Sequence, residues 1–445
     1  MIPFSALACL VERGGVRTEA SLEDLSAISL TLRLRPEDGT DAPDALTLRL
    51  HGLSDEAECT LPRGSFTWTQ EAGPDGVRLF RAETLSPAWR ALAGRYMREY
   101  SAYTQLKTQE GDAVMSQTLL GYNAAGEEQF FEDFSAQRRA MLAPLPDEGW
   151  AAAFARVPDV AIALSSTEVW TQYLAMPRDR FAAWYWCRGA LAHHPVARSR
   201  MTTVLIGSAV CPLLCPDADT ILRLAEKAER EGVTPVITLA PVSEGQMDEK
   251  LRLLSRLAED KRIPDGMEIV LNDWGMLAEA GRRFALRFSW TLGTLLQKRR
   301  KDVRMALMQG FGGRGEALRE NALNADFFLR FVQEMGVSRA SAEACGYPVS
   351  MPEMPVSLHL PFYQMNTAPR CTLRAVCEAG DRGAQTPDDA CPHWCRERSF
   401  LYPAMLNMAG RYNTLYGLDE KILTDGAYLA QLVGGRVDRV VVDLL

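Results

Sequence analysis

The sequence predicts an α/β protein with a C-terminal barrel of the TIM type, a small N-terminal antiparallel β-barrel and a helical connector between them. Two observations carry this prediction. Short alternating strands broken by Gly, Asp and Pro fill residues 1 to about 88, and strand and helix patterns alternate after residue 200. At 445 residues the chain is long enough for two or three hydrophobic cores.

The N-terminal segment, residues 1–100, is predicted to form the small antiparallel barrel. ISLTLRLR and ALTLRLHG alternate apolar and polar residues, and EDGTDAPD between them is typical of a turn. A helix is expected over SPAWRALAGRYMREYSAY, where Ser86 can cap and Pro87 takes the first helical position. The helical and aromatic segment 101–200 is interpreted as a connector without a motif that carries chemistry.

The C-terminal segment, residues 201–445, alternates between strand and helix patterns. The β-branched run TTVLIGSAV precedes the helical pattern PDADTILRLAEKAEREG, in which Ile221, Leu222, Leu224 and Ala225 form an apolar stripe. VTPVITLA and MEIVLND each precede a further helix, and ALRFSW follows as a short strand. Short links between strands and helices predict parallel strands with right-handed crossovers, and the length favours a barrel over an open sheet.

The charge balance sets limits on the partners. The chain has 49 basic and 57 acidic residues and a net charge of -8, which argues against a nucleic-acid or anionic-membrane footprint for the whole chain. Neither a signal peptide nor a run of eighteen apolar residues is recognised, so a cytoplasmic protein without membrane contact is expected. Structural disulfides are rare in that compartment, which makes clustered cysteines candidate metal ligands or redox groups.

Four of the ten cysteines lie in the stretch CTLRAVCEAGDRGAQTPDDACPHWC. Cys391 and Cys395 are four residues apart, and Pro392 is a suitable first helical residue, so both thiolates are expected on one face of a helix. Cys371 and Cys377 fall in a loop rich in Gly, Asp and Pro. Such a loop can bring one or both of these thiols to the helix.

Cys211 adds a distant thiol, because it follows the first predicted barrel strand at the end where ligands of such folds collect. Sets of four thiolates suit zinc or an iron–sulfur cluster. A zinc ribbon pairs two Cys-x2-Cys knuckles, which this chain lacks, so the looser spread favours a cluster over zinc. Unconnected buried cysteines are the third interpretation.

Polar groups after a later strand and in a basic stretch are candidate substrate ligands. Asn272 and Asp273 follow the strand MEIVL, although Asp273 is equally suited to cap the helix that begins at Trp274. QKRRKDVR is the densest basic stretch, and its Lys298 and Arg304 are candidates to bind an anionic substrate. A solvated helix end is the alternative interpretation of this stretch.

Residues 201–445 resemble peptidase family U32, and within it the branch of the anaerobic ubiquinone-hydroxylation proteins. The resemblance is carried by VLIGSAVCPLLCPDADT, MEIVLNDWGML, SLHLPFYQMNTAPRC, CPHWCRE and GRYNTLY, in this order. It implies a barrel-like domain with a 4Fe-4S cluster, whose ligands would be Cys211, Cys371, Cys391 and Cys395. Cys377 is an extra thiol close to Cys371, so the identity of the second ligand stays open.

The N-terminal segment resembles a degenerate PilZ domain through LEDLSAISLTLRL and GVRLFRAETLSPAWRALAGRYMREY. The family motif Asp-x-Ser-x-x-Gly corresponds to Asp24, Ser26 and Ser29, with serine in place of glycine. Arg13 and Arg17 have the Arg-x-x-x-Arg spacing used for cyclic di-GMP, but they fall on the first hairpin. Cyclic di-GMP binding is therefore not expected, and the resemblance implies a structural role or docking to a protein partner.

The predicted function is that of an iron–sulfur protein that carries out an oxygen-independent hydroxylation, or a related redox modification, of an anionic substrate. Relatives in family U32 hydroxylate ubiquinone precursors or RNA bases, and others are described as collagenase-like proteases. A U32-type protease is the first alternative, although no catalytic triad order and no His-Glu-x-x-His is present. A PilZ-like regulatory module without turnover is the second. Whether the substrate is a small anion, an RNA or a protein stays open.

Overall fold

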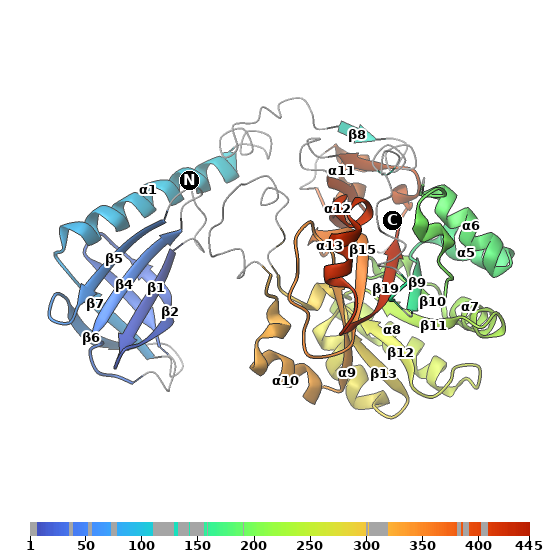
Figure 1. The fold of residues 1–445 in the computed structure, drawn as a ribbon, viewed down its shortest axis with the longest axis horizontal. Helices are drawn as coiled ribbons and strands as arrows, with labels where there is room; N and C mark the ends of the chain where they lie inside the picture. Colours follow the sequence, from blue (N-terminus) through green and yellow to red (C-terminus); the bar gives the residue numbers. More distant parts are fainter. Residues whose placement is uncertain are drawn as a thin grey trace. The chain divides into compact units, whose positions relative to one another are not determined.

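The structure of the chain is a computed structural model that falls into two compact units, Met1–Gly126 and Glu127–Leu445, each described by itself (Figure 1). The described residues are 7–34, 39–51, 56–72, 78–109, 129–131, 142, 155–157, 159–189, 191–299, 301, 319–380, 384–385, 391–401 and 408–445. Within these ranges no helix is both long enough and apolar enough to cross a membrane.

The first unit is an antiparallel sheet that forms a half-barrel, with one long helix. Its described strands have the order β5-β4-β1-β2-β3-β7-β6. The elements are β1 (Leu7–Arg13), β2 (Val16–Leu25), β3 (Ser29–Arg33), β4 (Ala45–His51), β5 (Glu56–Pro62), β6 (Thr67–Ala72), β7 (Arg78–Glu83) and α1 (Pro87–Gln109). Trp89 of α1 is buried with Leu48 and Phe80 of the sheet in one core. Helix α1 begins at Pro87 as predicted, and Ser86 Oγ accepts a hydrogen bond from Trp89 N at 3.4 Å.

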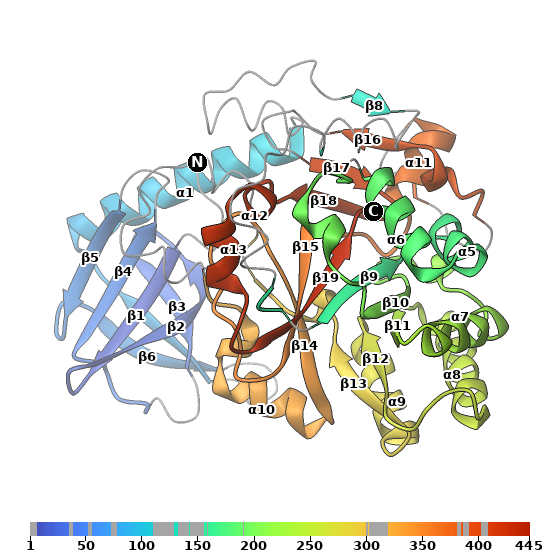
Figure 2. The ribbon, with the colours of Figure 1, turned by 45° about the vertical axis from the view of Figure 1, so that its right-hand side comes forward.

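The second unit contains a closed barrel of eight described parallel strands, which confirms the TIM-type prediction (Figures 1 and 2). The strands follow one another in chain order, and the last one pairs with both the seventh and the first. They are β9 (Asp159–Leu164), β10 (Thr203–Gly207), β11 (Thr234–Leu239), β12 (Met267–Leu271), β13 (Phe288–Leu292), β14 (Val337–Glu343), β15 (Val356–Thr367) and β19 (Val437–Asp443). Helices that join these strands are α5 (Thr167–Ala175), α6 (Arg178–Arg188), α7 (Ala218–Arg230), α8 (Glu244–Glu259), α9 (Trp274–Phe284), α10 (Asp326–Glu334), α12 (Lys421–Thr424) and α13 (Gly426–Leu432).

Helix α7 shows why the alternating pattern folds as predicted. All four residues of its apolar stripe are buried against the barrel. Asp217 Oδ1 accepts a hydrogen bond from Thr220 N at 2.8 Å and so caps the first turn. The chain then turns at Gly232, whose φ of 67° lies in the left-handed region that glycine adopts without strain.

The barrel begins earlier than the sequence analysis expects. Strand β9 and helices α5 and α6 belong to it, although they lie in the segment 101–200 that was interpreted as a connector. The short apolar run of β9 is flanked by helical patterns, and such a run does not distinguish a strand from part of a helix. Cys211 consequently follows the second barrel strand and not the first.

An insertion between β15 and β19 contributes three described strands to a second, antiparallel sheet, to which β15 and the earlier strand β8 also belong. Strand β15 is longer than its neighbours in the barrel, and its second half pairs with β18. This sheet has the order β15-β18-β17-β16-β8. Its further elements are β8 (Gln129–Phe131), α11 (Thr372–Ala379), the 3₁₀ turn η10 (Trp394–Arg396), β16 (Ser399–Leu401), β17 (Met408–Arg411) and β18 (Thr414–Leu418). The insertion therefore continues from the carboxyl end of β15, where TIM barrels carry their active sites.

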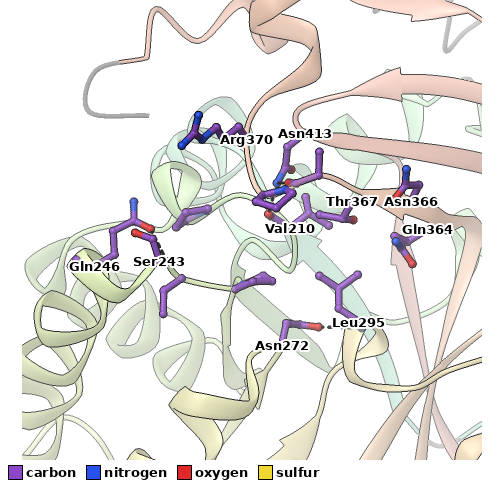
Figure 3. A pocket seen from close by; sticks show the side chains of 16 residues that line it. Val210, Ser243, Gln246, Asn272, Leu295, Gln364, Asn366, Thr367, Arg370 and Asn413 are labelled. Atoms are coloured by element: carbon purple, nitrogen blue, oxygen red, sulfur yellow. Dashed lines mark hydrogen bonds between the residues drawn. The ribbon is translucent and has the colours of Figure 1, made fainter. Parts of the chain in front are cut away.

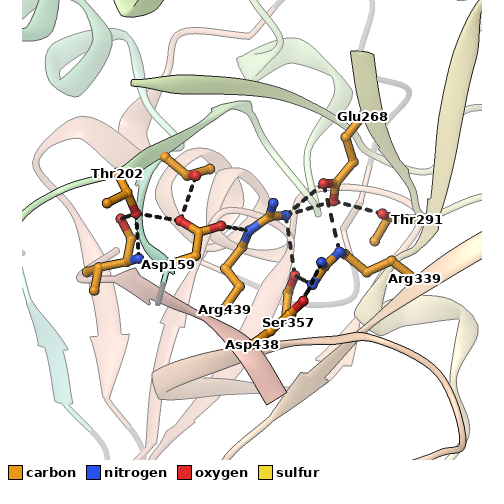
Figure 4. Close-up of polar contacts among 10 residues, drawn as sticks. Asp159, Thr202, Glu268, Thr291, Arg339, Ser357, Asp438 and Arg439 are labelled. Carbon is orange, nitrogen blue, oxygen red and sulfur yellow. Dashed lines mark hydrogen bonds and ion pairs between the residues drawn. The ribbon is translucent and has the colours of Figure 1, made fainter. Parts of the chain in front are cut away.

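The amino-terminal end of the barrel is closed by a network of ion pairs (Figure 4). Arg439 of β19 binds Asp159 of β9 and, with Nη1, both carboxylate oxygens of Glu268 of β12 at 2.9 and 2.8 Å. Arg339 of β14 pairs with Asp438 through both guanidinium Nη atoms. Hydroxyl groups donate to the carboxylates or accept from the guanidinium groups, and they belong to Thr202, Thr203, Thr291 and Ser357.

Candidate functional site

A cavity of about 830 Å³ lies at the carboxyl end of the barrel strands (Figure 3). It is within the size range of small-molecule sites and lies at the end of a TIM barrel where such sites are built. Its lining comes from the loops after β10 to β13, from the end of β15 and from the insertion: Val210, Pro212, Pro241, Val242, Ser243, Gly245, Gln246, Asn272, Leu295, Gln364, Asn366, Thr367, Ala368, Pro369, Arg370 and Asn413.

Two asparagines of this lining hold the walls of the cavity together. Asn272 is 2% exposed; its Nδ2 donates to Leu239 O at 3.1 Å, and its Oδ1 accepts from Leu295 N at 3.3 Å. Asn413 Nδ2 donates to Val210 O at 2.9 Å and to Ala368 O at 2.8 Å. Both amides are committed to the backbone, so the predicted site residue Asn272 lines the cavity but serves its architecture.

Other polar groups of the lining keep donors free for a ligand. Gln364 Oε1 accepts from Lys301 Nζ at 3.1 Å, and Gln246 Oε1 accepts from Ser243 N at 3.2 Å, while neither amide nitrogen donates to a described residue. Arg370 is exposed and forms no ion pair with a described residue. None of the residues that line the cavity is acidic. Guanidinium and amide nitrogens are donors, so the cavity favours a ligand with anionic or carbonyl oxygens.

Four thiols gather beside this cavity. Burial raises the pKa of Cys211 to about 12, a backbone hydrogen bond at Leu213 lowers the pKa, and the thiols of Cys395, Cys371 and Cys391 raise it. Such interactions between thiols fall off with distance, so Cys211 lies near the other three, which come from the insertion. The sequence positions are far apart, and the fold brings them together.

Backbone groups hold two of these sulfur atoms. Cys371 precedes α11, where its Sγ accepts from Arg374 N at 3.3 Å and donates to Tyr412 O at 3.2 Å. Cys391 Sγ accepts from His393 N at 3.3 Å.

Cys395 is the most enclosed of the four, with 8% of its surface exposed. Burial raises its pKa, and the buried guanidinium of Arg411 acts in the opposite direction. Arg411 Nε also donates to Cys395 O at 3.1 Å. A cation is thus fixed next to the group of thiols, where it stabilises negative charge.

Two predictions about the surroundings of the thiols differ from the structure: Cys377 lies on α11 and not in a loop, and Cys391 and Cys395 do not lie on one α-helix. Burial raises the pKa of Cys377, while a hydrogen bond and the charge of Arg398 lower it, and none of the four gathered thiols influences it. Cys391 and Cys395 do not share an α-helix: His393 has a φ of 58°, and only the 3₁₀ turn η10 follows. Pro392 therefore does not begin a helix, and the loop conformation positions the two thiols.

Two of the remaining predicted site residues, Asp273 and Lys298, do not line the cavity. Asp273 caps α9, because its Oδ1 accepts from Met276 N at 2.9 Å and its Oδ2 accepts from Val242 N at 3.4 Å, as the capping interpretation predicts. Lys298 is exposed and does not line the cavity. Arg304 lies outside the described residues. The sequence analysis missed Arg370, although its position directly before Cys371 could have drawn attention to it.

Zinc and a four-iron cluster require different spacings of their thiolates. Among the residues that the structure describes, no three His, Cys, Asp or Glu side chains are grouped closely enough to hold one metal ion. Zinc binds four ligands at about 2.3 Å for sulfur, so its thiolates must be in mutual contact. In a four-iron cluster each thiolate binds a different iron, and the sulfur atoms stand further apart. Four cysteine sulfur atoms are a donor set that either kind of centre uses.

Comparisons with known proteins add little to this picture. No protein-family model and no curated protein matches the chain. The solved structure of the U32 peptidase Mk0906 is similar, with a TM-score of 0.30 and 10% identity over 64% of this chain and 92% of that chain. A likeness at this TM-score carries no argument about activity or site residues. The resemblances to family U32 and to PilZ domains stay predictions.

Proposed function

We propose that the chain is a redox enzyme in which Cys211, Cys371, Cys391 and Cys395 hold a 4Fe-4S cluster beside a cavity for an anionic substrate. One observation carries the proposal. The cavity-lining residues Val210 and Pro212 flank Cys211, and the cavity-lining Arg370 directly precedes Cys371. A group bound by these thiols would lie at the wall of the cavity.

The ionisation of the thiols supports the proposal that they bind a group that contains metal cations. Thiolates are the form that ligates metals, and burial raises the pKa of both Cys211 and Cys395, so the free thiolates are disfavoured there. Iron would offset this cost by neutralising the thiolate charge. A gathered set of buried thiols is therefore more suited to hold such a group than to act as a free nucleophile.

The reaction that fits this arrangement is an oxygen-independent hydroxylation or a related redox modification. The cluster, when bound, would pass the two electrons that leave the substrate one at a time to an external electron acceptor, while water would supply the oxygen atom and two protons would be released. The chain's own residues bind and orient the substrate. Arg370 pairs with its anionic group, and the amide nitrogens of Gln246 and Gln364 donate to its oxygens. Lys301 fixes the orientation of the Gln364 amide through its contact with Oε1.

The two alternative functions have less support. A protease needs a nucleophile next to a general base, and the described lining of the cavity contains no His, Asp or Glu. A nucleotide-binding role of the first unit needs free arginines. Arg17 instead pairs with Glu12 at 2.7 Å, and Arg13 donates to Asp41 O.

Metal analysis of anaerobically purified protein tests the proposal. We expect about four iron and four sulfide per chain, with a broad absorption band that fades on reduction. Serine at position 211, 371, 391 or 395 is expected to lower the iron content strongly, because serine oxygen is a poor substitute for a thiolate.

Two other cysteines serve as matched controls. Cys377→Ser and Cys215→Ser change thiols of the same unit that none of the four gathered thiols influences. Both variants are expected to keep the full iron content. Iron-free wild-type protein after anaerobic reconstitution, or iron loss in Cys377→Ser but not in Cys371→Ser, would contradict the assignment.

The anionic-substrate part is tested separately with a probe pair of the same shape. 2-Naphthoate is expected to bind more tightly than the neutral 2-naphthamide. Arg370→Gln should reduce the ratio of the two affinities about tenfold, which corresponds to about 1.4 kcal/mol. Arg230→Gln, which replaces an exposed arginine of α7 away from the cavity, is the control. Equal affinity for the two probes would argue against an anionic ligand and would leave the cluster assignment intact.

A further inference from the structure

The interior of the barrel, between the ion-pair network and the cavity, contains polar side chains from three strands: Thr238 of β11, Ser341 of β14 and His359 of β15. Their inward direction follows from the strand register, because paired residues of parallel strands point to the same face. Thr238 pairs with Val270, a member of the small apolar cluster inside the barrel. Thr238 therefore faces the interior.

The same argument places the other two side chains. Ser341 pairs with Ser357, whose Oγ accepts from Arg439 in the interior network. His359 pairs with Glu343 one step further along the same two strands, and a step of two residues keeps the side. Ser341 and His359 thus face the interior, as Thr238 does.

These three residues carry polar atoms without a protein partner. Thr238 Oγ1, Ser341 Oγ and His359 Nε2 are buried and form no hydrogen bond to any described residue. Thr238 is 5% and Ser341 1% exposed, so bulk water does not reach them. Buried polar atoms in native proteins are almost always satisfied by protein or by ordered water. Ordered water inside the barrel would satisfy such atoms.

The barrel also has room at this level. His359 is only half-buried although it lies inside a closed barrel, so its accessible surface borders an interior space. The apolar cluster inside the barrel contains the short side chains of Ala161 and Ala163 of the first strand, together with Leu205, Val236, Val270 and Val441. Polar walls and room for a solvent molecule are the two conditions for a buried water site.

We propose that the barrel interior binds water, or an uncharged molecule of similar size, through Thr238 Oγ1, Ser341 Oγ and His359 Nε2. An uncharged occupant is indicated because two hydroxyl groups and one imidazole provide no net charge. The charged groups that face His359, Glu343 and Arg439, have opposite signs. Burial lowers the pKa of His359 to about 4, which keeps the imidazole neutral near pH 7.

This site lies next to the cavity described above. Glu343 accepts from Gln364 N at 2.7 Å and also binds Lys301, and Gln364 lines the cavity. The proposed water is therefore close to where substrate would bind, and the reaction proposed for the cavity can draw on it. Its use rests on the proposed function, but its existence does not.

Two variants of the full chain test the proposal, because the direction in which their stability changes depends on whether water is bound. If the hydroxyls bind water, Thr238→Val and Ser341→Ala remove hydrogen bonds and should lower the midpoint of chemical denaturation. If the hydroxyls are dry and unpartnered, the same changes remove a burial cost and should leave the midpoint unchanged or raise it. The second result overturns the proposal. Thr291→Val, which removes a hydroxyl that donates to Glu268 at 2.8 Å, shows the size of a true loss.

A measurement on the unaltered protein covers the case in which a variant fails to fold. The chain has five histidines, so histidine-selective isotope labelling gives a simple spectrum, and His359→Gln identifies the signal. We expect magnetisation transfer from water to the His359 ring and a chemical shift of Nε2 typical of a hydrogen-bonded nitrogen. A ring without water contact and with a free Nε2 overturns the proposal. Iron content is not expected to change in any of these variants, which separates this test from that of the cluster.

Discussion

The two ends of the barrel use polar residues in opposite ways. At the amino-terminal end Asp159, Glu268, Arg339 and Arg439 bind one another and nearby hydroxyls. At the carboxyl-terminal end thiols gather beside a cavity that offers unused donors such as Arg370. The difference teaches which end can accept a ligand. Groups that satisfy one another contribute to stability, while groups left unused are available for binding.

The largest expected effect breaks the closed end. Arg439→Met should destabilise the second unit by about 3–5 kcal/mol, because it leaves the half-buried Asp159 without its arginine and Glu268 with only the more distant Arg339 at 3.9 Å. Chemical denaturation measures this loss. Arg256→Met removes an exposed pair with Asp219, of which 58% and 68% are exposed, and should cost less than about 1 kcal/mol. Equal effects of the two changes would show that the network adds no stability of its own.

A smaller effect concerns His359, which lies between the two ends. Burial lowers its pKa to about 4, while Glu343 raises the pKa and Arg439 lowers it. The unfolded chain takes up a proton near pH 6.5 and the folded chain does not, so stability is present above that pH and is lost as the pH falls toward 4. The loss should reach about 3 kcal/mol. Denaturation curves for His359→Gln should lack this part of the pH dependence, and an unchanged slope would refute the buried neutral imidazole.

The smallest effect sharpens the contrast at the open end. Asp273→Ala removes the cap of α9 and should cost about 1 kcal/mol, whereas Asp273→Asn keeps an acceptor and should cost much less. Both variants are expected to bind iron and 2-naphthoate as the unaltered chain does. A loss of binding without a loss of stability would return Asp273 to the list of site residues.

The sequence predicts the local elements of the barrel well. Continuous apolar runs followed by amphipathic helices predict β10 to β13 and their helices. A parallel strand that is buried on both faces consists mainly of apolar residues, so it is recognised in the sequence. Strand β9 escapes this signal, since Asp159–Leu164 stands between two helical patterns. The extension of β15 is also hidden, because pairing with β18 depends on residues about fifty positions later in the chain.

The candidate site is predicted only in outline. Thiol chemistry singles out the cysteines, but the choice between Cys371 and Cys377 depends on the orientation of α11, which spacing alone does not set. Asn272 is correctly placed at the carboxyl end of a strand, but its amide forms hydrogen bonds with the backbone of Leu239 and Leu295. Whether a polar group already has a hydrogen-bond partner in the protein depends on its neighbours in space, and a single sequence does not contain this information.

Strand β15 sets the spacing between the barrel interior, the cavity and one of the thiols. It carries His359 in the interior and Gln364 at the cavity, and Arg370 and Cys371 follow its last residue within four positions. Each strand residue advances the chain by about 3.3 Å and reverses the facing side. Deleting one residue between His359 and Gln364 would therefore move the cavity-lining residues that follow it and a thiol out of register with the barrel in a single step.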